Sequence, residues 1–144
     1  MKLFRYPMQS VLDYRKDVEE EEKQKFAEAL KEYLQQKEIL NDFEQKLNDA
    51  FLVKADSSKH RVYELKNLSQ YIQYLKEKKD IQEQLVMETE REMEVRRQEL
   101  ISAQKDRKII EKHKEKSLNQ YLSELNQAEQ KTIDELALYS YMRR

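Results

Sequence analysis

The sequence has 144 residues, of which 40% are charged and 38% are hydrophobic, and its formal net charge at pH 7 is −1. It contains no glycine, no cysteine and a single proline. The lack of glycine excludes the phosphate-binding P-loop, the dinucleotide-binding fingerprint and the nucleophile elbow of hydrolases, because each needs at least two glycines. The lack of cysteine excludes disulfides, thiolate zinc sites and thiol catalysis.

This composition is typical of a long helix with one apolar stripe rather than of a compact domain. A globular domain of this length needs several sharp turns, which one proline and no glycine hardly provide. Disorder is the alternative for so polar a chain. Nine tyrosines, four phenylalanines and regularly spaced leucines argue against disorder, since disordered chains are poor in such residues. We therefore predict an all-α protein.

The first helix is predicted over residues 8–52, after a lead-in of residues 1–7. Pro7 suits the first turn of a helix, because its φ is fixed and its missing N–H would have no partner there. Apolar residues then recur mostly at spacings of three and four: Met8, Val11, Leu12, Val18, Phe26, Leu30, Tyr33, Leu40, Phe43, Leu47 and Phe51. The stripe thins between Leu12 and Phe26. Charged residues occupy the seam positions there, so weak pairing is expected: Arg15, Lys16, Glu19 and Glu22.

A turn is predicted over residues 53–58, where Asp56, Ser57 and Ser58 supply turn or N-cap chemistry. The fold expected from this turn is an antiparallel two-helix coiled-coil hairpin with a long, unequal second helix. The turn contains neither glycine nor proline. A continuous helix that forms a parallel dimer is therefore the alternative to the hairpin.

The second, longer helix is predicted over residues 59–140, followed by a tail of residues 141–144. Its apolar residues alternate by three and four with polar interruptions, as in a heptad: Leu65, Leu68, Ile72, Leu75, Val86, Met93, Leu100, Ala103 and Ile110. After Ile110 the apolar frame slips by one position to Leu118, instead of continuing through Lys114 and Ser117. Such a stutter locally unwinds a supercoil.

The two predicted arms differ in length, at about 65 Å and about 120 Å for a rise of ~1.5 Å per residue. In an antiparallel hairpin, the first arm is expected to cover the second only to about Leu100. The remainder of the second arm still carries apolar residues: Ile110, Leu118, Tyr121, Leu122, Leu125, Ile133, Leu136 and Tyr139. An apolar stripe of this size without an intrachain partner predicts an external one.

Catalytic, metal and nucleic-acid sites are not expected. His60 and His113 lie far apart in the sequence and are expected to be solvated helix residues, and Asp134 beside Glu135 points about 100° away from it on a helix. The basic run from Arg96 to Lys116 contains interleaved acids at spacings that form intrahelical pairs, unlike a DNA-binding basic region. We predict no cofactor, no metal, no nucleic acid and no small-molecule substrate.

A membrane span or a secretion signal is not expected either. The longest apolar runs are far shorter than the ~18 to 20 residues that cross a bilayer. The N-terminal stretch carries charges, Gln and Asp where a signal peptide would be apolar: MKLFRYPMQSVLDYR.

Three stretches together resemble the flagellar export protein FliJ family of the bacterial flagellar type III secretion apparatus. They are RYPMQSVLDYRKDVEEE (5–21), AQKDRKIIEKHKEK (103–116) and EQKTIDELA (129–137). The first and last of these are the specific parts, and the middle resembles any coiled coil. The similar length extends the resemblance over essentially the whole chain.

The resemblance implies an antiparallel two-helix coiled coil that is similar to the central stalk of rotary ATPases. By the same resemblance, the protein is a non-enzymatic stalk and assembly factor that binds the flagellar export ATPase ring, the cytoplasmic domain of the export gate and export chaperones. Its implied location is the cytoplasm, peripheral to the inner membrane at the flagellar base.

Residues that match the N-terminal motif of the family are Phe4, Met8, Val11, Leu12 and Arg15, and residues that match the C-terminal motif are Glu129, Lys131, Ile133, Asp134 and Glu135. Together with Leu122 and Leu125 on the unpaired stripe, they are the candidate partner-binding residues. Packing between the helices is the competing role for the apolar members. Two other functions remain open, a coiled-coil tether that homodimerises and a holdase-type chaperone.

Overall fold

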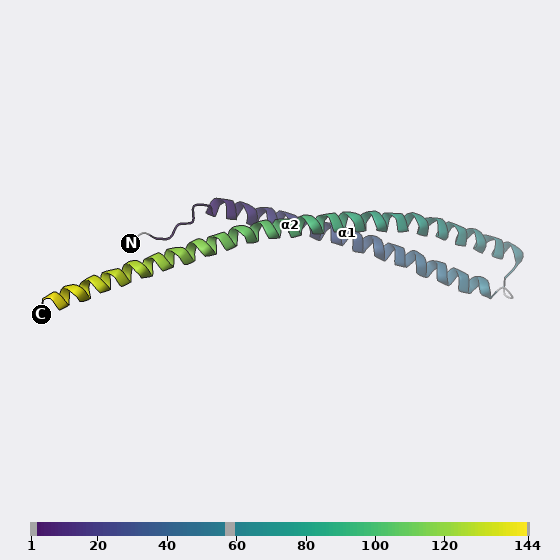
Figure 1. Ribbon diagram of the computed structural model, residues 1–144. Helices are drawn as coiled ribbons and strands as arrows, with labels where there is room; N and C mark the ends of the chain where they lie inside the picture. The colour runs from purple at the N-terminus through teal and green to yellow at the C-terminus, as the bar shows by residue number, and fades with distance from the viewer. Residues whose placement is uncertain (1–2, 57–59, 144) are drawn as a thin grey trace. The chain divides into compact units, whose positions relative to one another are not determined.

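The computed structural model describes residues 3–56 and 60–143, which form two long helices (Figure 1). Helix α1 runs over Gln9–Ala55 and helix α2 over Val62–Met142. The two helices pack against each other in antiparallel directions, with no strand in the described ranges. The predicted all-α helical hairpin is therefore confirmed, and the continuous-helix and disordered alternatives are wrong.

Local hydrogen bonds explain where the helices begin. Before α1, the Gln9 amide donates to the Tyr6 carbonyl at 3.2 Å, directly around Pro7. At the start of α2, the Arg61 amide donates to the Glu64 carboxylate at 3.1 Å, which is one half of a capping box. Glu64 also places a negative charge at the positive end of the helix dipole.

The expected turn at residues 53–58 overlaps the end of α1 and the undescribed segment. Helix α1 continues to Ala55, and the Asp56 amide donates to the Val53 carbonyl at 3.3 Å. Ser57 and Ser58, which were expected to supply turn chemistry, lie outside the described residues. No residue in the described ranges has a positive φ, so the lack of glycine imposes no backbone strain there.

The chain divides into two compact units, each of which contains a stretch of both helices. We call Glu21–Leu100 the central unit and Met1–Glu20 with Ile101–Arg144 the terminal unit. The two units differ in what holds their helices together.

The central unit has an apolar core near the loop end of the hairpin. Its buried members are Leu47 and Ala50 from α1 and Ile72 and Leu75 from α2, with Phe43 and Leu68 packed against them. Farther along, a buried Gln82 amide donates to both the backbone carbonyl and the side-chain oxygen of Gln36, each at 2.8 Å. A polar layer is thus satisfied inside an otherwise apolar seam.

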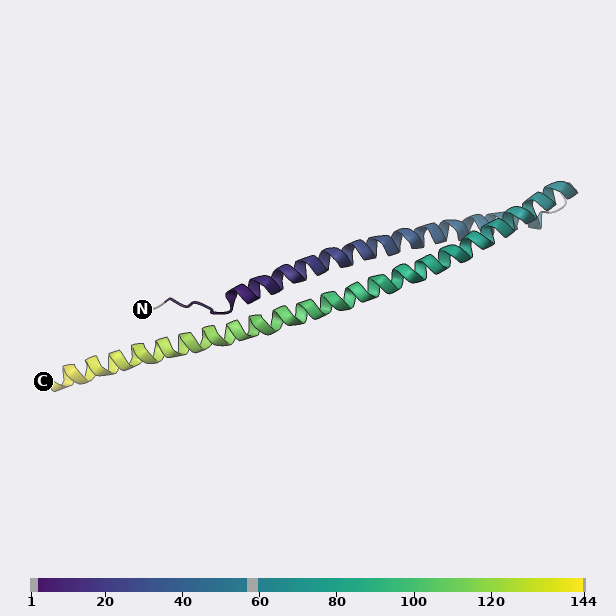
Figure 2. The same ribbon diagram turned by 90° about the horizontal axis from the view of Figure 1, so that it is seen from above.

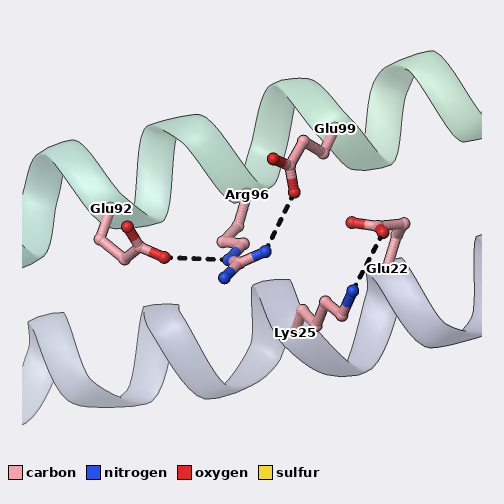
Figure 3. Close-up of polar contacts among 5 residues, drawn as sticks. All are labelled: Glu22, Lys25, Glu92, Arg96 and Glu99. Carbon is pink, nitrogen blue, oxygen red and sulfur yellow. Dashed lines mark hydrogen bonds and ion pairs between the residues drawn. The ribbon is translucent and has the colours of Figure 1, made fainter.

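Beyond this polar layer, charged residues line the central unit in the part of α1 that was expected to pair weakly (Figure 3). On α2, the Arg96 guanidinium donates to Glu92 at 2.9 Å and to Glu99 at 3.1 Å, and these bonds raise its pKa above the ordinary value. On α1, Lys25 pairs with Glu22 at 3.4 Å. Among the described residues, the second carboxylate oxygen of Glu22 is buried without a hydrogen-bond partner.

The terminal unit is held by a mixture of apolar, aromatic and ionic contacts. Leu12 is only 2% exposed and Tyr6 is also buried. The Tyr6 hydroxyl shares a hydrogen bond of 2.6 Å with Nδ1 of His113, which is an exposed helix residue as expected but also contacts the lead-in. The rings of Phe4 and Tyr121 lie 5.5 Å apart.

Ion pairs connect the two helices where the apolar stripe of α1 is thin. Arg15 contacts Asp106 at 2.9 Å, and Arg107 bonds to the buried Glu19. Arg107 also donates to Glu111 at 2.7 Å on its own helix, and hydrogen bonds to Glu111 and Glu19 raise the pKa of the guanidinium. Charged side chains therefore occupy the seam here in place of apolar ones.

The expectation that the first arm covers the second only to about Leu100 is wrong. Contacts from the N-terminal part of the chain reach His113 and Tyr121. Helix α2 begins at Val62 rather than at residue 59, which moves the pairing toward its C-terminal end. The lead-in before α1 is not helical, and a non-helical segment spans up to ~3.3 Å per residue against ~1.5 Å in a helix. Among the described residues, the part of α2 without an intrachain partner therefore begins after Tyr121.

The packed face of α2 does not follow the apolar frame slip after Ile110. Lys114, Ser117 and Tyr121 are half-buried and continue the original frame, whereas Leu118 is 37% exposed. The slip therefore turns the apolar residues away from the face that meets the N-terminal segment. No helix in the described part of the chain is both long and apolar enough to cross a membrane.

Candidate partner-binding surface

The N-terminal candidate residues lie at the contact between the N-terminal segment and α2. Leu12 is buried, while Val11 and Phe4 are half-buried, and Phe4 packs on Tyr121. Arg15 is paired with Asp106. Met8, at 37% exposed, retains the most free apolar surface of the set. Most of these side chains therefore hold the hairpin together within the terminal unit.

The C-terminal candidates lie on a part of α2 that no other described segment covers. We call residues 122–143 the C-terminal extension; in Figure 2 it is the yellow-green end of α2, which continues past the start of α1. Leu125 is half-buried, and every residue from 126 to 143 is exposed. The extension nevertheless displays large apolar side chains: Leu122, Ile133, Leu136, Leu138, Tyr139, Tyr141 and Met142.

Polar contacts within the extension are local to its helix. Gln130 donates to Asp134 at 3.0 Å, and the Thr132 hydroxyl donates to the Ala128 carbonyl at 3.0 Å. Glu129, Lys131 and Glu135 form no hydrogen bond or ion pair with any described residue. These three charged groups therefore remain available to a partner.

A shallow hollow lies on the surface of the extension. Its lining consists of Leu125, Ala128, Glu129, Thr132 and Ile133. Ala128 contributes only a methyl group to the lining, Leu125 and Ile133 contribute large apolar side chains, and Glu129 contributes a carboxylate.

The structure does not bring the two groups of candidate residues together. The N-terminal group reaches α2 no farther than Tyr121, through Phe4. Glu129 lies about 12 Å beyond Tyr121 along the helix axis, for a rise of ~1.5 Å per residue. The C-terminal group therefore forms a surface of its own.

Two residues at this end of the molecule were not predicted from the sequence. Tyr6 is a buried anchor of the lead-in, and its position in the RYP stretch beside the only proline was the available signal. Ala128 lines the hollow, and its spacing of three from Leu125 was the signal for it. Neither sequence feature identifies its residue until the structure shows which face of α2 the residue meets or lies on.

Groups suited to chemistry are not assembled in the described ranges. No three His, Asp or Glu side chains there are placed to hold a metal ion. Resolved pKa shifts belong to Glu94, Arg96 and Arg107, all of which lie outside the extension. The extension instead presents exposed apolar side chains on a helix together with charged residues.

The antiparallel helical hairpin, whose longer helix carries an apolar face that no other described segment covers, defines a class, the α-helical coiled-coil proteins. The family model for the flagellar FliJ protein matches residues 4–144. The chain therefore belongs to the flagellar FliJ family and is related to flagellar export. Neither a curated protein nor a solved structure matches the chain significantly.

Proposed function

We propose that this protein is a non-enzymatic stalk and assembly factor of the flagellar type III export apparatus, and that it binds the export ATPase ring through its C-terminal extension. The observation that carries the proposal is the exposed apolar face of residues 122–143, which has no intrachain partner among the described residues. The C-terminal motif of the family lies on this same segment.

The extension has enough apolar surface to support binding. Seven of its large side chains are at least 44% exposed: Leu122, Ile133, Leu136, Leu138, Tyr139, Tyr141 and Met142. Full burial of one such side chain contributes ~1.5 to 3 kcal/mol, so full burial of six of them contributes on the order of 9 to 18 kcal/mol before the entropic cost of association. A surface of this kind on a solvent-exposed helix favours a protein partner.

The same proposal includes the cytoplasmic domain of the export gate and the export chaperones as further partners. It places the protein in the cytoplasm, peripheral to the inner membrane at the flagellar base. Family membership supports these partners, and the charged residues Glu129, Lys131 and Glu135 leave polar contacts for them. The hydrolysis of ATP belongs to the partner in this proposal.

The test is to titrate the purified protein into the cognate export ATPase. Ring formation and ATP turnover should both rise, and the absence of any effect at saturating protein would refute the proposal. The double variant Asp134→Lys with Glu135→Lys should reduce the effect without a change in helicity by circular dichroism. Glu20→Lys with Glu21→Lys is the matched control, since it reverses another exposed acidic pair, on α1.

A homodimerising tether is the second candidate, because the same exposed face could be covered by a second copy. Sedimentation at micromolar concentration separates the two functions. A monomer of 17.6 kDa favours the stalk, whereas a stable dimer favours the tether.

A further inference from the structure

The C-terminal extension contains its own coiled-coil seam, which we call the second seam. Residues at alternating steps of three and four form it: Leu122, Leu125, Glu129, Thr132, Leu136 and Tyr139. This spacing keeps side chains on one face of a helix that packs against another helix. The frame differs by one position from that of Lys114, Ser117 and Tyr121, which face the N-terminal segment. The second seam is therefore a separate packing face.

The hollow on the extension has the geometry that this kind of packing requires. In a coiled coil, a side chain of one helix inserts between four residues of the other, at positions i, i+3, i+4 and i+7. Leu125, Ala128, Glu129 and Thr132 have this spacing, and all four line the hollow. Ala128 contributes only a methyl group to this lining, which leaves room for a large side chain. In its spacing, the hollow matches the hole of a knobs-into-holes interface.

We propose that the second seam is covered by an amphipathic α-helix of the partner, which inserts a large aliphatic side chain above Ala128 and presents Lys or Arg to Glu129. This inference rests on the proposed function and specifies how the export ATPase is bound. It also rests on charge, since Glu129 on the second seam forms no hydrogen bond or ion pair with any described residue.

Charge argues against other occupants of the second seam. Residues 122–143 contain four acidic and two basic residues, which disfavours an anionic membrane or nucleic acid. A parallel second copy would place Glu129 opposite Glu129 inside the seam, and two buried like charges are costly. A different helix with a basic residue at that level avoids the repulsion.

The first test places a larger side chain in the hollow. Ala128→Leu should weaken binding to the cognate export ATPase by at least tenfold, because its larger side chain occupies the space of the incoming knob. Gln127→Leu is the matched control, since it adds the same side chain on the helix face opposite the second seam. Both substitutions retain good helix formers, so circular dichroism should show equal helicity. Equal binding by the two variants would overturn the inference.

The second test uses the absence of cysteine from the chain. Single cysteines introduced at each position from 122 to 139 are labelled with a thiol reagent, with and without the ATPase. Protection should recur every three or four residues and be strongest at 125, 128, 129 and 132. Uniform protection, or none along the extension, would overturn the helical mode of binding.

The outcomes separate this inference from the proposed function. If the wild-type protein neither binds nor stimulates the ATPase, both are refuted. If stimulation occurs without periodic protection, the proposed function stands and the helical partner is wrong. If the periodic protection appears without the ATPase and sedimentation shows a dimer, a second copy covers the seam and the proposed occupant is wrong.

Discussion

Leu12 is the most informative single position for the stability of the terminal unit. Its side chain is 2% exposed, whereas Leu138 on the C-terminal extension is 60% exposed. Leu12→Ala and Leu138→Ala make the same change in helix propensity and side-chain volume. The difference in the free energy of opening between the two variants therefore measures how much packing between the N-terminal segment and α2 contributes to stability.

The expected magnitude follows from the burial of Leu12. Truncation of a buried leucine to alanine costs ~2 to 5 kcal/mol, and a thin interface between two helices collapses more readily than a large core. We expect about 2 to 3 kcal/mol for Leu12→Ala and less than about 0.5 kcal/mol for Leu138→Ala. Since ~1.4 kcal/mol corresponds to a tenfold change, local opening of the terminal unit should become about 30- to 150-fold more frequent.

Amide hydrogen exchange over residues 9–20 measures this opening directly. The Leu12→Ala variant should exchange faster there by the stated factor, and the Leu138→Ala variant should match the wild type. Equal exchange in the two variants would refute the assignment of Leu12 to the packed interface. Circular dichroism checks that both proteins remain helical.

Three other predictions concern polar contacts. Tyr6→Phe removes the hydroxyl that bonds to His113 and should cost about 0.5 to 1.5 kcal/mol in urea unfolding, whereas Tyr141→Phe on the exposed extension should have no effect. Gln82→Leu removes the polar layer with Gln36. The free energy of unfolding should be kept, but the distribution of spin-label distances between the helices of the central unit should broaden, because the layer sets the register of the two helices. An unchanged distance distribution would count against the role of the layer in setting the register. Hydrogen bonds from Arg97 and Gln98 lower the pKa of Glu94 from its ordinary 4.5, so their stabilising effect is complete above 4.5 and is lost as the pH falls through the folded-state pKa. Arg97→Met should return that pKa toward 4.5 in an NMR titration, and a value that stays low would exclude Arg97 as its main cause.

The fold was largely predictable because its signals are local and repeated. The absence of glycine and the three-four spacing of residues such as Leu68, Ile72 and Leu75 predict long helices over any window that is chosen. A polar segment around Asp56 was enough to favour a hairpin. These patterns say that two apolar stripes meet, but they do not say which residue meets which.

The register was predicted less well because it depends on pairs of residues far apart in the sequence. Many carboxylates could pair with Arg107, and the choice of Glu19 follows only from the three-dimensional alignment of the helices. The lead-in has no periodic pattern, so the contact of Phe4 with Tyr121 had no signal in the sequence. The expected limit of the overlap at Leu100 failed for this reason.

The apolar positions of the candidate surface were predictable from the sequence, but the hollow on this surface was not. Exposed apolar residues such as Ile133 and Leu136 follow from their spacing and from the unequal arms. The hollow above Ala128 depends on which small side chain lies between larger ones, and a pattern of apolar positions overlooks a small residue. Family resemblance indicated the segment, and the geometry indicates how a helix fits it.

The two units should respond differently to ionic strength, because different forces close their helix pairs. Salt screens exposed charges over a distance of ~8 Å at physiological strength, and the Arg15–Asp106 pair is partly exposed. The Leu47, Ile72 and Leu75 core of the central unit contains no charge to screen. Concentrated sodium chloride should therefore loosen the start of α1 from α2 while the end near the loop stays closed, so the protein would open from its termini inward.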